Sequence, residues 1–325
     1  MSELLETKIQ SLLSGQGLKD DDSCNISSND VGGKELQNSS YIPVCQKTVT
    51  YIVAAVIFND KDEVLMIQEA KTSCHGKWYL PAGRVEKNEH LLDAVKREVL
   101  EETGLTMDPT TLIMVECASG SWFRFIFTGE IIGGNLKTLN EANGESLQAN
   151  WVSNFSELTL RSNDIIPLIE RCKNYIRNNS ILQHPHLLPM NKMHAKLILR
   201  LIITAKKKAT NKVHILIVDK SQVNLPVCEI NPHRNLLSTL HGYMVDIFGA
   251  NVPQHKPHGL LSIEFSSGIG GGDGLCLTLL VSFKLPLEEV PIVGDFIWYQ
   301  LSGNVAESLT ARLPRNMTVP LNVVR

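Results

Sequence analysis

The chain lacks the features that mark several classes of protein. Its seven cysteines are odd in number and form no CxxC pair, which argues against a disulfide framework and favours a reducing compartment. Its formal net charge of −3 lacks the basic excess of a protein that binds nucleic acid. No apolar run approaches the roughly 20 residues of a membrane-spanning helix, and the first residues do not resemble a signal peptide. We therefore expect a cytoplasmic protein with neither a nucleic-acid polymer nor a membrane among its partners.

The pattern along the 325 residues divides the chain into four segments. Residues 1–45 predict a short helix over 2–13, followed by a polar stretch that we expect to be largely disordered. Residues 46–178 form a first domain, and residues 179–190, which contain two prolines, predict a linker. Residues 191–325 predict a smaller α+β domain of unknown role.

The first domain alternates strand and helix patterns. Two strands over 50–58 and 63–70 are joined by the turn NDKD, which predicts a hairpin. A helix is predicted from Asn88, as its N-cap, to Gly104, and another over 162–179. Strands with alternating phenylalanines lie between them. Together these elements predict an α/β sandwich with a mixed sheet.

Three glutamates on one predicted helix need an explanation. The segment REVLEETG places Glu98, Glu101 and Glu102 at offsets of three and four, so they share a helix face. Like charges at this spacing repel by about 0.2–0.5 kcal/mol per pair, and the carboxyl end of a helix favours cations. Magnesium would supply the missing positive charge, because it prefers oxygen ligands and is held by carboxylates and substrate phosphates. An acidic, solvated helix face is the alternative.

The residues around these glutamates separate the two interpretations. Gly83 is followed after five residues by Glu89, and after seven more by REVLEETGL, residues 97–105. The pattern resembles the box of the Nudix hydrolase family, G-x5-E-x7-R-E-U-x-E-E-x-G-U with U aliphatic, at every defined position. The resemblance implies an enzyme that cleaves phosphorus anhydride bonds of nucleoside diphosphates linked to another moiety. It also implies an α/β/α sandwich, here followed by the smaller α+β domain.

The same resemblance implies a metal site. The ligands would be the carboxylates of Glu98, Glu101 and Glu102 together with the backbone carbonyl of Gly83. Glycine suits this position because it lets the backbone approach a metal closely. The implied cofactor is Mg²⁺, with Mn²⁺ as a substitute.

The remaining box residues would support these ligands. Arg97 would orient the glutamates, since a guanidinium can grip two carboxylate oxygens at once, and Glu89 would brace Arg97 by an ion pair. Gly104 would end the helix. The predicted catalytic residues are Arg97, Glu98 and Glu102.

Some site residues stay open at this level. Many family members use a further acid from a downstream loop, for which Glu141 and Glu145 are the candidates, and Glu145 is favoured because it lies closer to the next strand. The general base, either Glu98 or such a loop acid, and the attacked phosphorus are undetermined. Trp122 and Phe123 are the candidates for stacking on the substrate base, because they open a strand, although packing in the core is the favoured interpretation of any one aromatic residue here.

Segments outside the box narrow the substrate. QEAKTSCHGKWYLPAGRVE, SWFRFIFTG and LKTLNEANGESLQANW resemble family members described as 8-oxo-dGDP phosphatases. This resemblance implies hydrolysis of oxidised purine nucleoside diphosphates, such as 8-oxo-dGDP and 8-oxo-GDP, to a monophosphate and phosphate, which sanitises the nucleotide pool. Alternatives are ADP-ribose or a nucleoside triphosphate as substrate, or a nucleotide-sensing interaction protein with little turnover. The second domain could form a homodimer, dock a protein partner or cover the nucleotide site.

Overall fold

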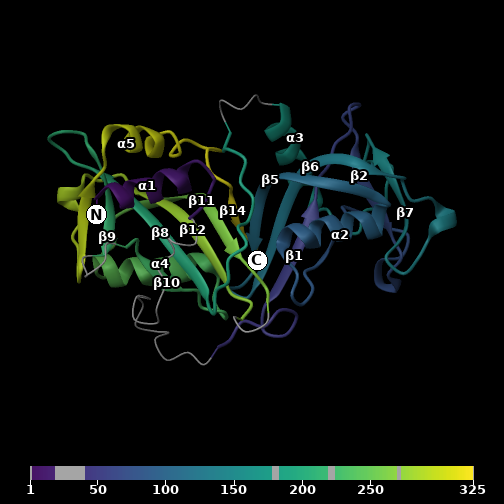
Figure 1. Ribbon diagram of the computed structural model, residues 1–325, viewed down its shortest axis with the longest axis horizontal. Coiled ribbons are helices and arrows are strands. Elements are labelled where there is room, and N and C mark those ends of the chain that lie inside the picture. Colours follow the sequence, from purple (N-terminus) through teal and green to yellow (C-terminus); the bar gives the residue numbers. More distant parts are fainter. Residues whose placement is uncertain (1, 19–40, 178–182, 219–223, 269–271, 325) are drawn as a thin grey trace.

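The computed structural model describes residues 2–18, 41–177, 183–218, 224–268 and 272–324. Two β-sheet units lie side by side along the longest axis of the molecule (Figure 1). Residues 19–40, most of the stretch expected to be disordered, lie outside the described residues. Within the described part of the chain, no helix is both long enough and apolar enough to cross a membrane. The cysteines in that part are all free and buried.

The first unit contains two sheets. A five-stranded mixed sheet has the order β14-β5-β6-β1-β4, in which β1 runs parallel to β6 and antiparallel to β4. A three-stranded antiparallel sheet has the order β3-β2-β7. The strands are β1 (Thr50–Ala55), β2 (Val64–Glu69), β3 (Trp78–Tyr79), β4 (Ala82–Arg84), β5 (Leu105–Cys117), β6 (Trp122–Gly134), β7 (Ser146–Val152) and β14 (Leu321–Val323).

Two helices cover opposite faces of the five-stranded sheet. Because side chains alternate along a strand, β6 turns Phe125 towards the core that contains Val95 of α2 (Leu91–Thr103). It turns Ile126 towards a separate core that contains Leu168 of α3 (Ile165–Arg177). The first unit is therefore the α/β/α sandwich with a mixed sheet that the sequence predicted.

The second unit is a six-stranded sheet with helices on both sides. Its order is β11-β12-β8-β9-β13, with the short β10 paired to β8. β8 and β9 form a hairpin around the lysine turn at 206–208, and β11 and β12 form a second antiparallel pair. The elements are β8 (Leu197–Lys206), β9 (Val213–Val218), β10 (Val227–Glu229), α4 (Leu236–Phe248), β11 (His255–Phe265), β12 (Leu275–Phe283), β13 (Phe296–Gln300) and α5 (Gly303–Thr310).

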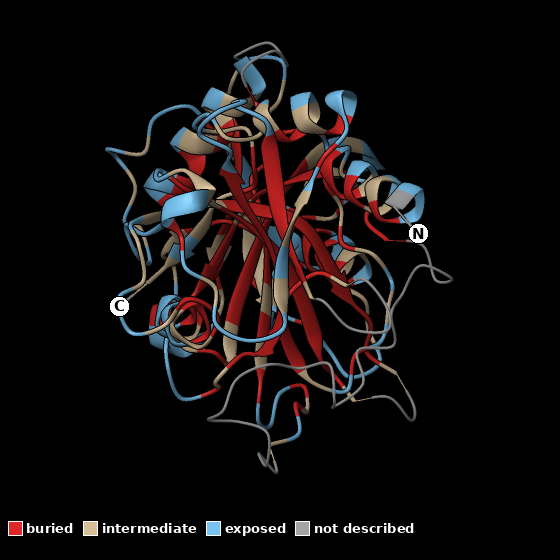
Figure 2. Ribbon diagram, turned by 90° about the vertical axis from the view of Figure 1, so that its left-hand side faces the viewer, coloured by how far each residue is buried: buried red, intermediate tan, exposed pale blue. Residues whose placement is uncertain are grey.

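The N-terminal helix α1 (Ser2–Leu13) belongs to this second unit. Its apolar residues Leu5, Ile9 and Leu12 share a buried cluster with Ile202 of β8 and Leu309 of α5. α4 covers the other face of the sheet. In Figure 2 the strands through the centre are buried, while the outer sides of the helices are exposed. The helix was predicted, but its place beside a sheet about 200 residues away in the sequence was not.

The two units share one continuous core. The ring of Tyr51 in β1 lies edge-on to that of Phe265 in β11, with centroids 4.7 Å apart, and its hydroxyl donates to the carbonyl of Asp273 at 2.6 Å. The part of the expected linker that the structure describes, residues 183–190, is packed rather than extended in solvent: Leu187 is buried and its carbonyl accepts from the Leu112 N–H at 2.9 Å.

Two local expectations about the first unit are wrong. β1 and β2 do not form a hairpin: beyond a single bridge between Phe58 and Val64, they enter different sheets. Asn88 does not cap α2, because it adopts a left-handed φ of 62° in the preceding turn and the N-cap is His90. Polar turn residues precede both β2 and α2, so composition alone could not show how β1 and β2 pair or at which residue α2 begins.

Candidate active site

The predicted box occupies strand β4, the loop after it and helix α2. Gly83 pairs with Val53 of β1, which places β4 at the edge of the five-stranded sheet. α2 ends at Gly104, whose φ of 75° is left-handed and whose N–H donates to the Leu100 carbonyl at 2.9 Å. The loop folds β4 against α2, and the Glu98 carboxylate lies against Gly83.

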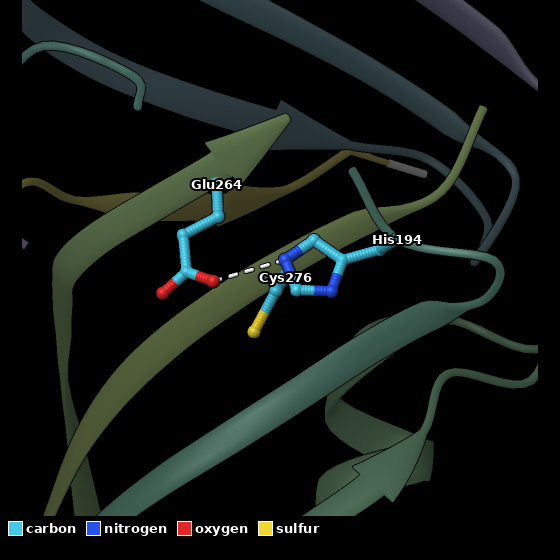
Figure 3. A group of neighbouring side chains, drawn as sticks. All are labelled: His194, Glu264 and Cys276. Carbon is cyan, nitrogen blue, oxygen red and sulfur yellow. Dashed lines mark hydrogen bonds and ion pairs between the residues drawn. The ribbon is translucent and has the colours of Figure 1, made fainter. Parts of the chain in front are cut away.

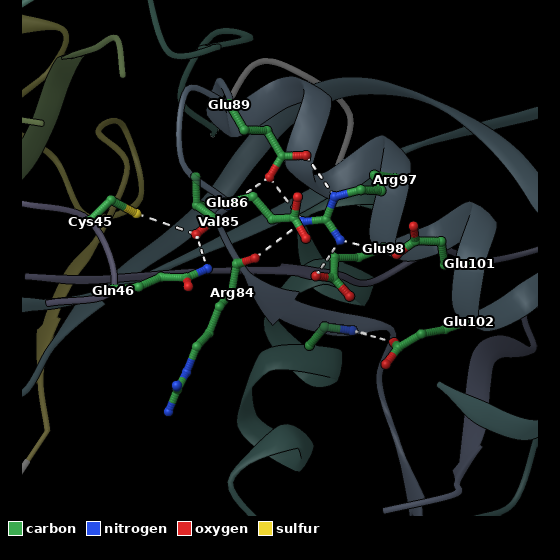
Figure 4. A network of polar contacts seen from close by, with 11 residues as sticks. Cys45, Gln46, Arg84, Val85, Glu86, Glu89, Arg97, Glu98, Glu101 and Glu102 are labelled. Carbon is green, nitrogen blue, oxygen red and sulfur yellow. Dashed lines mark hydrogen bonds and ion pairs between the residues drawn. The ribbon is translucent and has the colours of Figure 1, made fainter. Parts of the chain in front are cut away.

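Arg97 binds three of the acidic residues at once (Figure 4). Its Nε and Nη2 donate to the two oxygens of Glu89 at 2.6 and 2.9 Å. Its Nη1 donates to Glu98 Oε1 at 2.8 Å and to Glu101 Oε2 at 3.1 Å. Its Nη2 also donates to the Arg84 carbonyl at 3.1 Å, which ties α2 to β4. This is the geometry expected of a residue that orients the glutamates, with Glu89 as its brace.

Glu98 and Glu102 are buried, and the positive charge near them does not fully offset the effect of burial on their pKa values. Glu102 is 1% exposed, and its Oε2 accepts from the Ala82 N–H at 2.8 Å. Burial raises the pKa of Glu102 to about 8, since the Ala82 bond does not offset it and the neighbouring Glu98 adds to it. Burial also raises the pKa of Glu98, in spite of Arg97. A cation beside these groups would favour their ionised forms.

The space around Gly83 is compatible with a metal site. A Cβ atom at this position would lie 2.0 Å from Glu98 Oε1 and 2.2 Å from Oε2. Any side chain at this position would therefore displace the Glu98 carboxylate. Carboxylate oxygens next to an unobstructed backbone are a donor set of the kind that Mg²⁺ prefers, so the residues present fit the implied ion.

The two downstream acids differ in their surroundings. The Glu141 carboxylate accepts from the N–H and the hydroxyl of Thr138, both at 2.8 Å, and caps a single helical turn. Glu145 is exposed in the loop before β7 and contributes to the electrostatic environment of Lys137. Lys137 in turn donates to the Glu101 carbonyl at the end of α2. Of the two, Glu145 is the acid whose carboxylate is not committed to a cap.

One of the two predicted stacking residues is misassigned. Phe123 is fully buried and stacks on Tyr51 at a centroid distance of 6.0 Å, so it packs in the core and does not face a nucleotide. Trp122 is partly exposed, on the same side of β6 as Arg124. Position in the strand could not show which of Trp122 and Phe123 is buried, because burial by the second unit decides this.

A polar cluster near the box was not predicted from the sequence. Arg124 Nη1 donates to the Tyr79 hydroxyl at 2.8 Å and to Asp164 Oδ2 at 2.7 Å, and Arg124 Nε donates to Glu116 Oε2 at 2.7 Å. Tyr79 precedes Ala82, the donor to Glu102, by three residues. An arginine between the phenylalanines of FRF is a charge on a buried strand that requires partners, which is the signal that was overlooked.

A second arginine closes this cluster from the solvent side. Arg161 lies over the Tyr79 ring, 4.8 Å from its centroid, and donates to Glu69 Oε1 at 2.6 Å. Glu69 ends β2 and pairs with Ser146 of β7, whose hydroxyl donates to the Glu102 carbonyl at 2.6 Å. A chain of contacts therefore links the Tyr79–Arg124–Asp164 cluster to the end of the box helix.

The second unit contains another group of metal-ligand residue types, His194, Glu264 and Cys276 (Figure 3). His194 Nε2 lies 2.9 Å from Glu264 Oε2, but Arg200 Nη1 also donates to Glu264, at 2.6 Å, and Lys192 Nζ lies 3.6 Å away. Burial raises the pKa of the Cys276 thiol to about 12, which disfavours the thiolate that a metal would bind. Two cationic side chains on one carboxylate exclude a further cation, and this group is a buried ion-pair cluster.

Comparisons with known proteins identify the family to which this chain belongs. A NUDIX domain model matches residues 49–166. The 8-oxo-dGDP phosphatase NUDT18 of Danio rerio is 36% identical over 296 residues, covering 90% of this chain and 86% of its own length. The protein of the same name from Homo sapiens is 37% identical, covering 85% of this chain and 88% of its own. A solved NUDIX hydrolase from Nitrosomonas europaea is 29% identical, covering 42% of this chain and 97% of its own, with a TM-score of 0.34. This chain is a member of the Nudix hydrolase family.

Proposed function

We propose that this enzyme hydrolyses oxidised purine nucleoside diphosphates, such as 8-oxo-dGDP and 8-oxo-GDP, to the monophosphate and phosphate in a Mg²⁺-dependent reaction. The observation that carries the proposal is the extent of the similarity: relatives with the name 8-oxo-dGDP phosphatase match over more than four fifths of their length. The match therefore includes the second unit and not the box alone. The product would be a nucleotide that cannot re-enter the triphosphate pool without a new phosphorylation.

The phosphate end of the substrate would meet the box. Glu98, Glu101, Glu102 and the Gly83 carbonyl would hold Mg²⁺, or Mn²⁺ in its place. The bound ion would polarise a phosphoryl oxygen and lower the pKa of a coordinated water. Arg97 holds Glu98 and Glu101 at 2.8 and 3.1 Å, which fixes two of these carboxylates before a substrate arrives.

In the reaction, the oxygen of a water molecule forms a bond to one phosphorus and the bridging P–O bond breaks. The proton of the water passes to a carboxylate, for which Glu98 in the box and Glu145 in the exposed loop are the two candidates. Glu98 is already held by Arg97, whereas Glu145 would reach the site by movement of its loop. A carboxylate that accepts this proton must be ionised when the substrate is bound.

The base end would meet Tyr79, Arg124 and Asp164. The Asp164 side chain is 38% exposed, so an acceptor for the N–H edge of a guanine base is accessible at the surface of the cluster. The bonds from Arg124 and Tyr79 outweigh the burial of Asp164 and hold its pKa below its usual value, so it accepts as a carboxylate. Arg161 over the Tyr79 ring supplies a planar cation at the same end.

Product analysis with Mg²⁺ on 8-oxo-dGDP, 8-oxo-dGTP, dGDP and ADP-ribose tests this proposal, with Glu102→Gln as a matched inactive variant. We expect preferential formation of 8-oxo-dGMP and phosphate from the diphosphate, lost in Glu102→Gln. Asp164→Asn should weaken the preference for 8-oxo-dGDP over dGDP more than it lowers kcat. Turnover of ADP-ribose or the triphosphate alone would overturn the substrate assignment, and tight binding without turnover would indicate a nucleotide sensor.

A further inference from the structure

The C-terminal strand β14 joins the sheet of the first unit from the far end of the chain. It pairs in parallel with β5, in the register Leu321 with Val115 and Val323 with Cys117. The Val115 N–H donates to the Pro320 carbonyl and the Val324 N–H to the Cys117 carbonyl, both at 2.9 Å. Figure 1 shows this strand beside β5, between the two units. An edge strand of the catalytic sheet is thus supplied by residues that follow the entire second unit.

The segment just before β14 is fixed to the second unit. The N–H of Leu260 in β11 donates to the Val319 carbonyl at 2.7 Å, and the Val319 N–H donates back at 3.1 Å. Val319 is fully buried. Within five residues, therefore, the chain is hydrogen-bonded first to the sheet of the second unit and then to that of the first.

The register of β14 aligns a row of polar side chains across the sheet. Asn322 is opposite Glu116 of β5, and Glu116 is opposite Arg124 of β6. Registered neighbours in a sheet point to the same face and contact each other. We call Asn322, Glu116 and Arg124 the polar row.

Hydrogen bonds along the polar row connect the C-terminal strand to the Tyr79–Arg124–Asp164 cluster. Asn322 Nδ2 donates to Glu116 Oε1 at 3.2 Å, while the other oxygen of Glu116 accepts from Arg124 Nε at 2.7 Å. Glu116 is 4% exposed, so its two oxygens depend on these donors for compensation. Arg124 Nη1 then reaches Tyr79 and Asp164.

We infer that β14 is a specificity element for the nucleobase, in which Asn322 is a positioning residue that orients Glu116 and, through it, Arg124 and Asp164. This inference rests on the proposed function, because it takes the Tyr79–Arg124–Asp164 cluster as the base-reading end of the site. It gives the second unit a role in substrate choice, since that unit fixes the chain at Val319 immediately before the polar row begins.

Asn322→Asp is the primary test, because it keeps the shape of the side chain, removes the donor and places a second carboxylate beside Glu116. We expect KM for 8-oxo-dGDP to rise about 10-fold, a size typical of coupling within a hydrogen-bonded network, with kcat within about twofold of wild type. The preference for 8-oxo-dGDP over dGDP should fall by a similar factor. Asn322→Gln keeps an amide donor and should lie close to wild type.

Asn251→Asp is the matched control, because it makes the same chemical change at an exposed asparagine of the second unit. Asn322→Ala, which removes the donor without adding charge, replaces the primary variant if thermal unfolding shows that Asn322→Asp is not folded. An unchanged substrate preference and KM in the folded Asn322 variant would overturn the inference, as would a loss of kcat equal for both nucleotides.

The wild-type panel separates this failure from failure of the proposed function. If wild type prefers another nucleotide to 8-oxo-dGDP, the proposed substrate is wrong, and the ratio between that nucleotide and one with a different base takes the place of the 8-oxo-dGDP to dGDP ratio. A change of that ratio in Asn322→Asp supports the positioning role, and an unchanged ratio refutes it.

Discussion

Two clusters of charged side chains in this chain differ in which charge is in excess. In the box, one guanidinium from Arg97 binds three carboxylates, and the buried Glu102 lies beyond its reach. In the second unit, the single carboxylate of Glu264 is bonded to Arg200 and His194, and Lys192 Nζ lies 3.6 Å away. Both clusters contain residue types that bind metals.

The balance of charge explains why only one of them fits a cation. In the second unit, Arg200 and His194 outweigh burial and hold the pKa of Glu264 well below its usual range, so its charge is already compensated. In the box, burial raises the pKa of Glu102 to about 8, and the Ala82 N–H and the charge of Lys71 offset this only in part. Residue types that can bind a metal are therefore not enough to identify a metal site. Negative charge that no neighbouring cation compensates is the stronger criterion.

The largest expected effect is a loss of activity when a glutamate of the box is replaced. Glu102→Gln should lower kcat by on the order of 10³-fold, because it removes a carboxylate that would hold the metal opposite the developing phosphate charge. Steady-state kinetics with saturating Mg²⁺ measure it. Glu264→Gln is the same chemical change in the other cluster and should leave kcat within about twofold; an equal loss in both variants would contradict the assignment.

Removing the one carboxylate of the second cluster should affect stability rather than activity. Glu264→Gln leaves Arg200 and Lys192 buried beside a neutral amide, which should lower the free energy of unfolding of the second unit by about 3–5 kcal/mol. Urea denaturation followed by tryptophan fluorescence measures this change. The same measurement on metal-free Glu102→Gln should show no destabilisation, and a larger loss there than in Glu264→Gln would reverse the comparison.

The arginine of the box sharpens the comparison. Arg97→Lys keeps the charge but cannot donate to Glu89, Glu98 and Glu101 together, since an ammonium lacks the planar fork. We expect the affinity for Mn²⁺ to fall about 10-fold, as is typical when the partner of a metal ligand is lost. Electron paramagnetic resonance of free Mn²⁺ reports it. Unchanged affinity would mean that the glutamates are oriented without Arg97.

The last expected effect is a pH dependence of stability, whose sign should differ between the two clusters, because the box loses stability as the pH rises. The folded-state pKa of Glu102, about 8, lies above its unfolded value, so ionisation costs stability as the pH rises between the two values. In the presence of a chelator, wild type should lose on the order of 3 kcal/mol relative to Glu102→Gln between pH 5 and pH 8. Thermal unfolding of both proteins measures it, and Mg²⁺ should reduce the difference. A difference that grows towards low pH would contradict the sign.

How much of the site could be predicted depends on sequence separation. Arg97, Glu98 and Glu102 lie on one helix, where periodicity alone places them on a shared face, and Gly104 ends that helix for a local reason. Tyr79 lies in β3, Arg124 in β6, Asp164 in the turn before α3, and Asn322 in β14. Only the packing of the sheets brings them together, and no local pattern encodes that packing.

The same limit applies to the fold. The alternation of Phe123 and Phe125 correctly predicted a strand that turns both residues to one face, but not that Tyr51 and the second unit would bury that face. The hairpin expected between β1 and β2 was wrong because a polar turn between two strands is compatible with either one sheet or two. Local signals determined the elements, and contacts between distant segments determined which of them pair.

The most direct test of the central claim is a Mn²⁺ titration, followed by electron paramagnetic resonance, of wild type, Glu102→Gln and Glu264→Gln side by side. The account predicts that wild type and Glu264→Gln bind Mn²⁺ equally and that Glu102→Gln binds it at least about 10-fold more weakly. Loss of binding in Glu264→Gln with normal binding in Glu102→Gln would place the metal in the second unit and contradict the account.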